Sequence, residues 1–169
     1  MSTLSLNTNK PCIYLLLGSN LGKRKYQIDK AKALIQSLIG DIISESSIYE
    51  TQPWGNLDQK SFLNQAVGIK SQLTPEQMLE KIHDIEKEMG RSRKEKNEPR
   101  IIDIDILLWE KTMIQNVDLE IPHPRLHLRN FALVPLMEIA GSQMHPKFHK
   151  SIEALYEECD DQLEVYLKN

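Results

Sequence analysis

The order in which the hydrophobic pattern changes along the chain constrains its fold more than any other feature of the sequence. Apolar runs of strand-like length or alternation occupy residues 12–17, 42–49, 62–69 and 101–109. Apolar residues spaced three and four apart predict a helix over 23–39 and another over 74–90. The order strand, helix, strand, strand, helix, strand is that of a ferredoxin-like sheet. We therefore predict an α+β fold with a βαββαβ core, an antiparallel sheet and C-terminal additions.

Residues at the helix ends and after the last core strand refine this prediction. Gly40 and Gly90 stand where helices often end, and Thr74 with Pro75 predicts a helix start. After Trp109 we expect a hairpin, an apolar segment over 131–139 and a last helix over about 150–158. These segments are the expected C-terminal additions.

Length and charge indicate one globular domain over 1–169, with 1–10 as a loose N-terminal extension. The 169 residues are 40% hydrophobic and carry a net charge of −3, so a general nucleic-acid or membrane-surface binder is disfavoured. The apolar run 13–17 is too short to cross a bilayer, and 1–10 has no signal-peptide core. Cys12 and Cys159 match no metal or disulfide spacing, which indicates reduced thiols. We expect a cytoplasmic protein with no nucleic-acid or membrane partner.

Asp103 and Asp105 flank Ile104 within the fourth predicted strand. Because side chains alternate along a strand, both carboxylates lie on one face, roughly 7 Å apart. Two acids there repel each other unless a cation lies between them, and hard oxygen ligands suit Mg²⁺ carried in with phosphates. The alternative is an exposed strand face with two solvated acids.

A basic segment, residues 91–100, directly precedes this strand. Its five cationic side chains outnumber two acidic ones in a chain that is negative overall. Arginine presents a planar fork that matches phosphate oxygens, so the segment is a candidate polyphosphate clamp. An ordinary solvated loop is the alternative, and the adjacent aspartates favour the clamp.

Two histidine pairs and a glycine-rich turn are weaker signals. His123 and His127, like His145 and His149, are four residues apart, but intervening prolines argue against a zinc-binding helix. His123, in a turn bracketed by prolines, is a candidate hydrogen-bond donor. The segment 18–24 lacks the spacing and the Ser or Thr of a phosphate-binding P-loop.

Several of these motifs, read in order, resemble one enzyme family, the 6-hydroxymethyl-7,8-dihydropterin pyrophosphokinases of folate biosynthesis. The resemblance covers about residues 13–140, and its motifs lie at 17–21, 49–55, 62–64, 90–94, 99–107 and 121–127. The Pro-Arg-x-x-Asp-x-Asp string together with Pro-His-Pro-Arg-Leu-His is its most specific part. The resemblance implies transfer of pyrophosphate from ATP to the pterin hydroxymethyl group, with release of AMP.

The resemblance also implies roles for individual residues on the nucleotide side. Asp103 and Asp105 would hold two Mg²⁺ ions that arrive with ATP. The implied catalytic residues are Arg91, Arg100, Asp103, Asp105 and His123. The implied ATP-binding residues are His83, Glu86, Arg93, Lys94, Arg100, Ile106, His123, Pro124 and Arg129. His83 stands where the well-known bacterial member has glutamine, and Asn97-Glu98 where the best-known members have Trp-Gly.

On the pterin side, the resemblance implies stacking by Phe62 and Phe131 and recognition of the ring edge by the amide of Asn64. The remaining implied pterin-binding residues are Thr51, Gln52, Pro53 and Trp54. Without the resemblance, both phenylalanines would be read as core residues. We expect a monofunctional, monomeric transferase whose partners are ATP and the pterin.

Two other function classes fit the same predicted fold. A ferredoxin-like RNA-binding module would carry aromatic residues on a central strand, whereas 101–109 carries acids. A nucleotide-sensing relative without activity would have lost a metal ligand, whereas Asp103 and Asp105 are both present. Both alternatives are therefore disfavoured.

Overall fold

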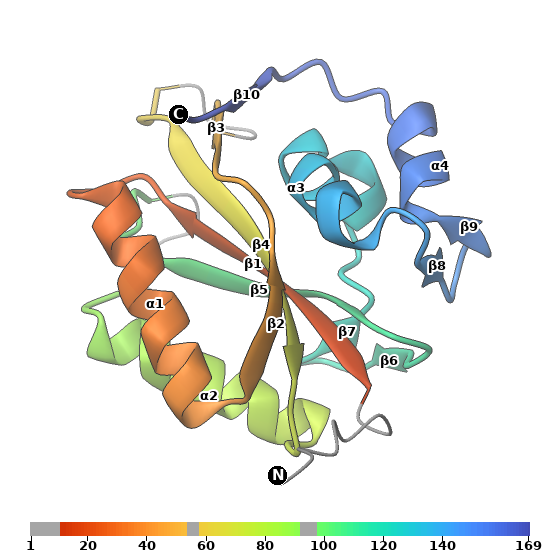
Figure 1. Ribbon diagram of the computed structural model, residues 1–169, viewed down its shortest axis with the longest axis horizontal. Coiled ribbons are helices and arrows are strands. Elements are labelled where there is room, and N and C mark those ends of the chain that lie inside the picture. Colours follow the sequence, from red (N-terminus) through yellow and green to blue (C-terminus); the bar gives the residue numbers. More distant parts are fainter. Residues whose placement is uncertain (1–10, 54–57, 92–97) are drawn as a thin grey trace, which may run out of the picture.

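The computed structural model describes residues 11–53, 58–91 and 98–169. Its main sheet has the order β10-β3-β4-β1-β5, with β2 also paired to β4, and every pair is antiparallel (Figure 1). The strands are β1 (Cys12–Ser19), β2 (Asp41–Glu45), β3 (Tyr49–Thr51), β4 (Phe62–Lys70), β5 (Asp103–Trp109) and β10 (Val165–Leu167). The helices are α1 (Arg24–Leu38), α2 (Pro75–Glu88), α3 (Asn130–Ala140) and α4 (Ile152–Glu158). The predicted α+β core with an antiparallel sheet is confirmed.

The central strand β1 is apolar on both faces because helices cover both faces of the sheet. Ile13, Leu15 and Leu17 pack in the core cluster that also holds residues of α1 and α2. Tyr14 and Leu16 pack in a second cluster with residues of α3 and α4. Figure 1 shows α1 and α2 on one side of the sheet and α3 with α4 on the other.

Local signals explain where α2 begins and ends. The Thr74 hydroxyl accepts from the Gln77 backbone N–H at 3.2 Å, and the Gln77 side chain accepts from Thr74 N–H at 2.9 Å. This capping box satisfies backbone donors at the helix start. Gly90, with φ of +91°, lies directly beyond the helix, in a conformation that suits glycine. The chain therefore leaves α2 at a defined point and enters the basic segment.

The predicted continuous strand over 42–49 is wrong, because the structure divides it into β2 and β3. From Glu45 to Tyr49 the chain advances four residues, while its partner β4 advances three, from Val67 to Asn64. An extra residue of this kind bends a strand. At the break, the Ser46 N–H donates to the Ala66 carbonyl at 2.9 Å, and the Ser46 hydroxyl accepts from the Ala66 N–H at 2.9 Å.

The C-terminal additions comprise short elements and two helices. A hairpin of β6 (Ile114–Gln115) and β7 (Glu120–Ile121) leads through the 3-10 turn η1 (Leu126–Leu128) into α3. The pair β8 (Met144–His145) and β9 (Lys150–Ser151) leads into α4. The edge strand β10, which the pattern of the sequence did not predict, pairs with β3.

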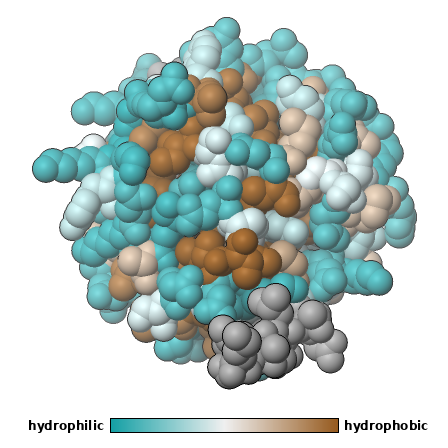
Figure 2. All heavy atoms as spheres, in the orientation of Figure 1, coloured by the Kyte–Doolittle hydropathy of each residue, from teal (hydrophilic) through white to brown (hydrophobic). Residues whose placement is uncertain are grey.

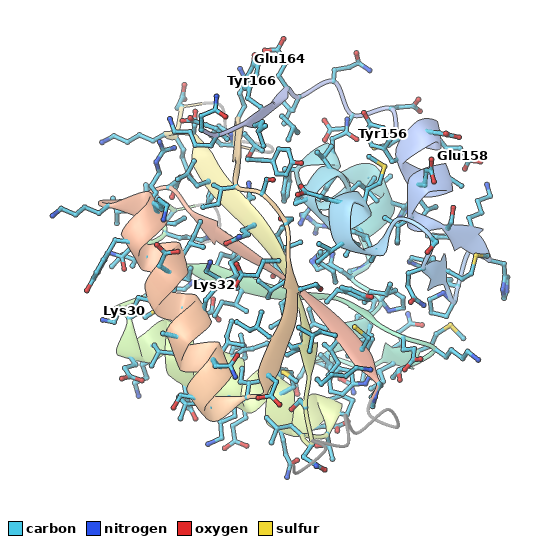
Figure 3. All side chains as sticks on the ribbon, viewed as in Figure 1. Lys30, Lys32, Tyr156, Glu158, Glu164 and Tyr166 are labelled. Atoms are coloured by element: carbon cyan, nitrogen blue, oxygen red, sulfur yellow. The ribbon has the colours of Figure 1, made fainter. Side chains whose placement is uncertain are left out.

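On the face drawn in Figure 2, hydrophobic patches of the described residues alternate with hydrophilic side chains. Figure 3 shows the side chains of Glu164 and Tyr166 at β10, and the Tyr166 hydroxyl donates to the Glu164 carboxylate.

Within the described ranges, none of the helices has both the length and the apolar character that crossing a bilayer requires.

Candidate active site

Three neighbouring strands place an amide, a glycine and a carboxylate in one row across the sheet. Asn64 on β4 pairs with Gly18 on β1, which pairs with Asp103 on β5. Since strands lie about 4.8 Å apart, Asn64 and Asp103 are separated by about 10 Å of sheet. A Cβ atom at Gly18 would lie 2.8 Å from Asn64 Oδ1. The bare glycine therefore leaves open the space beside the amide in the middle of the row.

Asp103 is held by two arginines from the basic segment. Arg91 Nη1 lies 2.7 Å from Asp103 Oδ1, and Arg100 Nη1 lies 2.7 Å from Oδ2. Burial by itself would raise the pKa of Asp103, but the two guanidinium groups outweigh it and lower that pKa below its ordinary value. Asp103 is therefore a carboxylate at neutral pH.

Asp105 has the opposite electrostatic setting. Burial and the neighbouring charge of Asp103 raise the pKa of Asp105 to about 7, against the attraction of Arg129, Arg100 and Arg91. The nearby arginines thus offset the negative charge of Asp103 but only part of the cost of charging Asp105. A bound cation would relieve this repulsion.

Glu86 reaches the same place from α2 and is 1% exposed. Its carboxylate pairs with Arg91 Nη1 and accepts from the Ile104 backbone N–H at 3.4 Å. Arg91 therefore bridges an acid on α2 and an acid on β5. The arrangement ties the start of the basic segment to the strand that carries Asp103.

Two hydrogen bonds hold His123 in place, one made by its backbone N–H and one by a ring nitrogen. Its N–H donates to the Leu107 carbonyl at 3.0 Å, and its Nδ1 accepts from the Arg125 N–H at 3.1 Å. Burial, together with Arg129 and Arg125, lowers the pKa of His123 to about 4, although Asp103 opposes this. A neutral ring whose Nδ1 accepts carries its proton on Nε2. His123 can therefore donate a hydrogen bond from Nε2, which leaves its predicted role as a donor to substrate a prediction.

Of the described residues expected to bind the pterin, those from Thr51 to Pro53 and both Phe62 and Asn64 lie on or next to β3 and β4, and Phe131 lies on α3. Asn64 Nδ2 donates to Thr51 Oγ1 at 2.8 Å, and both side chains are buried. Phe62 is on the same face of β4 as Asn64 and is partly exposed. The guanidinium carbon of Arg129 lies 5.4 Å from the centre of the Phe131 ring, a cation–π contact. Thr51 therefore orients the amide, and Arg129 flanks an aromatic face.

The remaining predicted site residues are less closely associated with this row. His83, Pro124 and Gln52 are exposed, whereas Pro53 is buried. The Ile106 side chain is buried in the core cluster with residues of α1 and α2, not beside Asp105. Trp54, Arg93, Lys94, Asn97 and the predicted N-terminal extension lie outside the described residues.

Asn20 is a residue of this region that the sequence interpretation did not select. It is 1% exposed, and its Oδ1 accepts from the Arg100 backbone N–H at 2.7 Å. The sequence signal that could have identified it is an asparagine in the turn directly after a predicted central strand, because an amide buried there needs hydrogen-bond partners. The sequence does not indicate those partners, since they are distant along the chain.

The donor set of Asp103 and Asp105 fits a cation that brings other ligands with it. No cluster of three or more His, Cys, Asp or Glu side chains that could hold a metal occurs in residues 11–53, 58–91 and 98–169. Two carboxylates alone cannot complete the coordination shell of Mg²⁺, which usually keeps water and substrate phosphates. The pair is therefore unsuited to a structural metal and suited to a metal–nucleotide complex.

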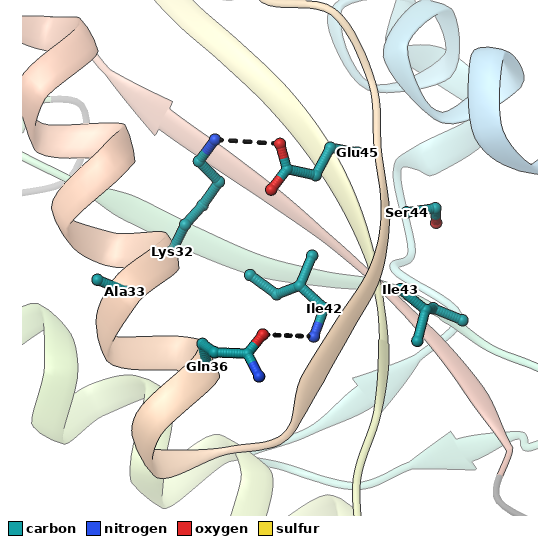
Figure 4. Close-up of a pocket in the computed structure, with 7 residues that line it drawn as sticks. All are labelled: Lys32, Ala33, Gln36, Ile42, Ile43, Ser44 and Glu45. Atoms are coloured by element: carbon teal, nitrogen blue, oxygen red, sulfur yellow. Dashed lines mark hydrogen bonds and ion pairs between the residues drawn. The ribbon is translucent and has the colours of Figure 1, made fainter. Parts of the chain in front are cut away.

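An open groove of about 460 Å³ lies elsewhere, between α1 and β2 (Figure 4). Its polar side chains have partners within the groove: Lys32 Nζ lies 3.2 Å from Glu45 Oε2, and Gln36 Oε1 accepts from the Ile42 backbone N–H at 2.9 Å. Strands β4 and β1 separate β2 from β5. The groove is therefore distinct from the row that carries Asp103.

Known proteins similar to this chain belong to one family of enzymes. A family model described as 7,8-dihydro-6-hydroxymethylpterin-pyrophosphokinase (HPPK) matches residues 14–141. The Bacillus subtilis 2-amino-4-hydroxy-6-hydroxymethyldihydropteridine pyrophosphokinase is 46% identical over 127 residues, which are 75% of this chain and 76% of that protein. A folic acid synthesis protein of Pneumocystis carinii is 38% identical over 88% of this chain and 20% of its own length.

A solved structure supports the fold. The Plasmodium falciparum HPPK-DHPS has a TM-score of 0.75 at 20% identity, over 91% of this chain and 45% of that chain. This chain thus spans less than half of the solved protein, and the likeness concerns the fold alone. On the family match and the sequence identity, the chain belongs to the 7,8-dihydro-6-hydroxymethylpterin-pyrophosphokinase family.

Proposed function

We propose that the protein transfers the pyrophosphoryl group of ATP to the hydroxymethyl group of 6-hydroxymethyl-7,8-dihydropterin and releases AMP, as a step of folate biosynthesis. In this reaction the hydroxymethyl oxygen bonds to the β-phosphorus, the bond from that phosphorus to the AMP oxygen breaks, and the hydroxyl proton is lost. We further propose that the chain acts as a single domain and a monomer in the cytoplasm.

The row Asn64–Gly18–Asp103 carries this proposal. It sets an amide suited to a heterocycle about 10 Å from a carboxylate flanked by arginines, on one face of three strands. An acceptor and a phosphate donor bound at the two ends would meet above Gly18. Positioning of this kind supplies much of the rate enhancement in phosphoryl transfer.

Arg91, Arg100 and His123 are the proposed phosphate-binding groups. Both arginines contact Asp103, and the fit of an arginine fork to phosphate oxygens supports this assignment. His123, neutral because its pKa is about 4, can donate from Nε2 at physiological pH. We also assign Arg93, Lys94, Arg129, Glu86 and His83 to the nucleotide, with Pro124 and the backbone of Ile106 as its neighbours, since the Ile106 side chain is in the core.

Asp103 and Asp105 are the proposed ligands of two Mg²⁺ ions. When bound with ATP, these ions would neutralise phosphate charge and align the displacement. For its part, the chain supplies two carboxylates of one strand face, whose mutual repulsion favours a cation between them. The proposal of magnesium rests on this donor chemistry.

Phe62, Phe131 and Asn64 are the proposed core of the pterin pocket, completed by Thr51, Gln52, Pro53 and Trp54. Stacking gives affinity that tolerates small rotations, whereas a buried amide left unpaired by a wrong ligand costs about 1–3 kcal/mol. The Thr51 hydroxyl already binds the amide nitrogen of Asn64. Specificity would therefore come from the Asn64 end of the row.

The direct test mixes the purified protein with ATP, MgCl₂ and 6-hydroxymethyl-7,8-dihydropterin and separates nucleotides by chromatography. AMP that forms only with pterin, and not with EDTA, is the expected result. ADP in place of AMP would contradict the pyrophosphoryl transfer and indicate an ordinary kinase. ATP binding without any product would instead favour a nucleotide-sensing protein.

A further inference from the structure

Asn20 connects the two halves of the candidate active site through its side chain. Its Oδ1 accepts from the Arg100 N–H at 2.7 Å, and its own N–H donates to the Arg100 carbonyl at 3.1 Å. Its Nδ2 donates to Gln59 Oε1 at 3.1 Å and to the Lys60 carbonyl at 3.2 Å. One amide group therefore holds a phosphate-side arginine and the segment that enters β4.

Each contact lies directly beside a proposed substrate-binding residue. Arg100 reaches Asp103 Oδ2 at 2.7 Å, so a shift of the Arg100 backbone would move its guanidinium group on that carboxylate. Gln59 and Lys60 lie just before Phe62, the first residue of β4. The Asn20 side chain is rigidly placed, because it is 1% exposed and uses both its oxygen and its nitrogen.

The entry segment 59–61 has a second anchor that does not involve Arg100. Arg24 Nη1 donates to the Ser61 carbonyl at 2.9 Å and to Glu50 Oε1 at 3.0 Å. Arg24 thus ties the entry segment to β3, whereas Asn20 ties it to the phosphate side. Arg24 therefore supports the pterin side alone, whereas Asn20 connects the pterin side to the phosphate side. Variants at the two positions can separate these two effects.

We propose that Asn20 is a positioning residue that couples nucleotide binding at Arg100 to pterin binding at the start of β4. This inference rests on the proposed function. When Arg100 is drawn onto phosphate, its backbone stays bound to Asn20, whose amide nitrogen holds the entry segment in the pterin-binding arrangement. Linkage requires the same coupling in the reverse direction.

The test measures the Kd of 6-hydroxymethyl-7,8-dihydropterin by titration calorimetry, with and without saturating α,β-methylene ATP and MgCl₂. The ratio of the two Kd values is the coupling factor. For the wild type we expect the nucleotide analogue to tighten pterin binding at least about fivefold, the lower end of typical coupling between sites. Asn20→Asp keeps the acceptor for Arg100 but loses both donated bonds, and should reduce the factor below about twofold.

Three further variants keep the test decisive. Gln59→Met removes one partner of Asn20 without changing Asn20 and should give an intermediate factor, even where Asn20→Asp does not fold. Arg24→Met should weaken pterin binding equally in both nucleotide states and leave the factor unchanged. Gln36→Met makes a matched change in the groove between α1 and β2 and should behave as the wild type.

The outcomes distinguish this inference from the proposed function. A wild type that forms no AMP and binds no pterin overturns both. A wild type that binds both ligands without coupling, or an Asn20→Asp variant that keeps the wild-type factor, overturns the role of Asn20 alone. Melting temperatures of all variants separate loss of coupling from loss of structure.

Discussion

The Asp105 carboxyl group lies in a setting that disfavours its charged form relative to an exposed aspartate. Burial and Asp103 raise its pKa to about 7, so the charged group does not stabilise the ligand-free fold. We therefore expect Asp105→Ala to fold with an unchanged or slightly higher Tm and to lose AMP formation by roughly 1,000-fold or more, as a lost metal ligand implies.

Chromatography of AMP and a thermal melt measure the two effects. Asp118→Ala, at an exposed aspartate of the β6–β7 hairpin, is the matched control and should keep full activity. Retained turnover in Asp105→Ala would rule out Asp105 as a metal ligand.

The Thr51 hydroxyl accepts from Asn64 Nδ2 at 2.8 Å. Thr51→Val keeps the shape but leaves a buried donor unpaired, at a cost of about 1–3 kcal/mol, so pterin binding should weaken about tenfold. The affinity for α,β-methylene ATP should not change. Thr51→Ser, which keeps the hydroxyl, should restore pterin binding in calorimetry, and an equal loss in both variants would contradict the orienting role.

The short pair β8 and β9 carries a buried histidine at its turn. His145 is 2% exposed, and its Nδ1 accepts from the backbone N–H groups of Lys147 and Phe148 at 3.2 and 3.3 Å. Burial, with smaller contributions from His127 and Lys147, lowers its pKa to about 4. Because the folded state disfavours the proton, stability is present above the unfolded pKa of about 6.5 and is lost as pH falls from there toward 4.

We expect this element to make the fold sensitive to mild acid. Between pH 7.5 and 5, the two pKa values imply that His145 lowers the free energy of unfolding by about 2 kcal/mol. Since about 1 kcal/mol shifts the Tm of a chain of this size by roughly 2–4 °C, His145 should account for roughly 4–8 °C of the decrease in Tm. His145→Asn retains an acceptor that does not titrate and should flatten the dependence. His149→Asn is the control, because asparagine tolerates the φ of +54° at that exposed position. Identical slopes for wild type and His145→Asn would contradict the assignment.

The edge strand β10 supports the pterin side from the end of the chain. It pairs with β3, the Lys168 N–H donates to the Ile48 carbonyl at 2.8 Å, and Lys168 Nζ lies 3.1 Å from Glu50 Oε2. Deletion of residues 163–169 should therefore loosen β3, lower Tm by a few degrees and weaken pterin binding severalfold. Binding of the ATP analogue should stay within about twofold, and a selective loss of nucleotide binding would contradict this division.

Across the whole molecule, the sequence predicts what depends on local pattern. β1, α1 and α2 follow from apolar spacing, and the shared face of Asp103 and Asp105 follows from strand alternation. The break at Ser46 could not be predicted, because it depends on bonds to Ala66, twenty residues away. β10 carries a weak pattern and forms only because β3 offers an edge.

In the candidate site, too, some features could be predicted from neighbouring residues in the sequence and others depend on residues far apart in it. That the basic segment lies near Asp103 follows from its position directly before β5, whereas the contact between Arg100 and Asp103 is seen only in the structure. Asn20, in contrast, finds Arg100 eighty residues away and Gln59 thirty-nine residues away, so only the assembled sheet reveals its role. By alternation along β5, Ile106 points away from Asp105, and the assembled fold shows that this side chain packs in the cluster with residues of α1 and α2.

Gly18 also limits how this protein can evolve. Even a methyl group there would meet the Asn64 amide, which is already bound to Thr51. A population under selection by an inhibitor of the pterin pocket could vary the rim of the pocket, but position 18 would stay closed to it. Few single amino-acid substitutions would therefore give resistance to a compound that binds in the space next to Gly18.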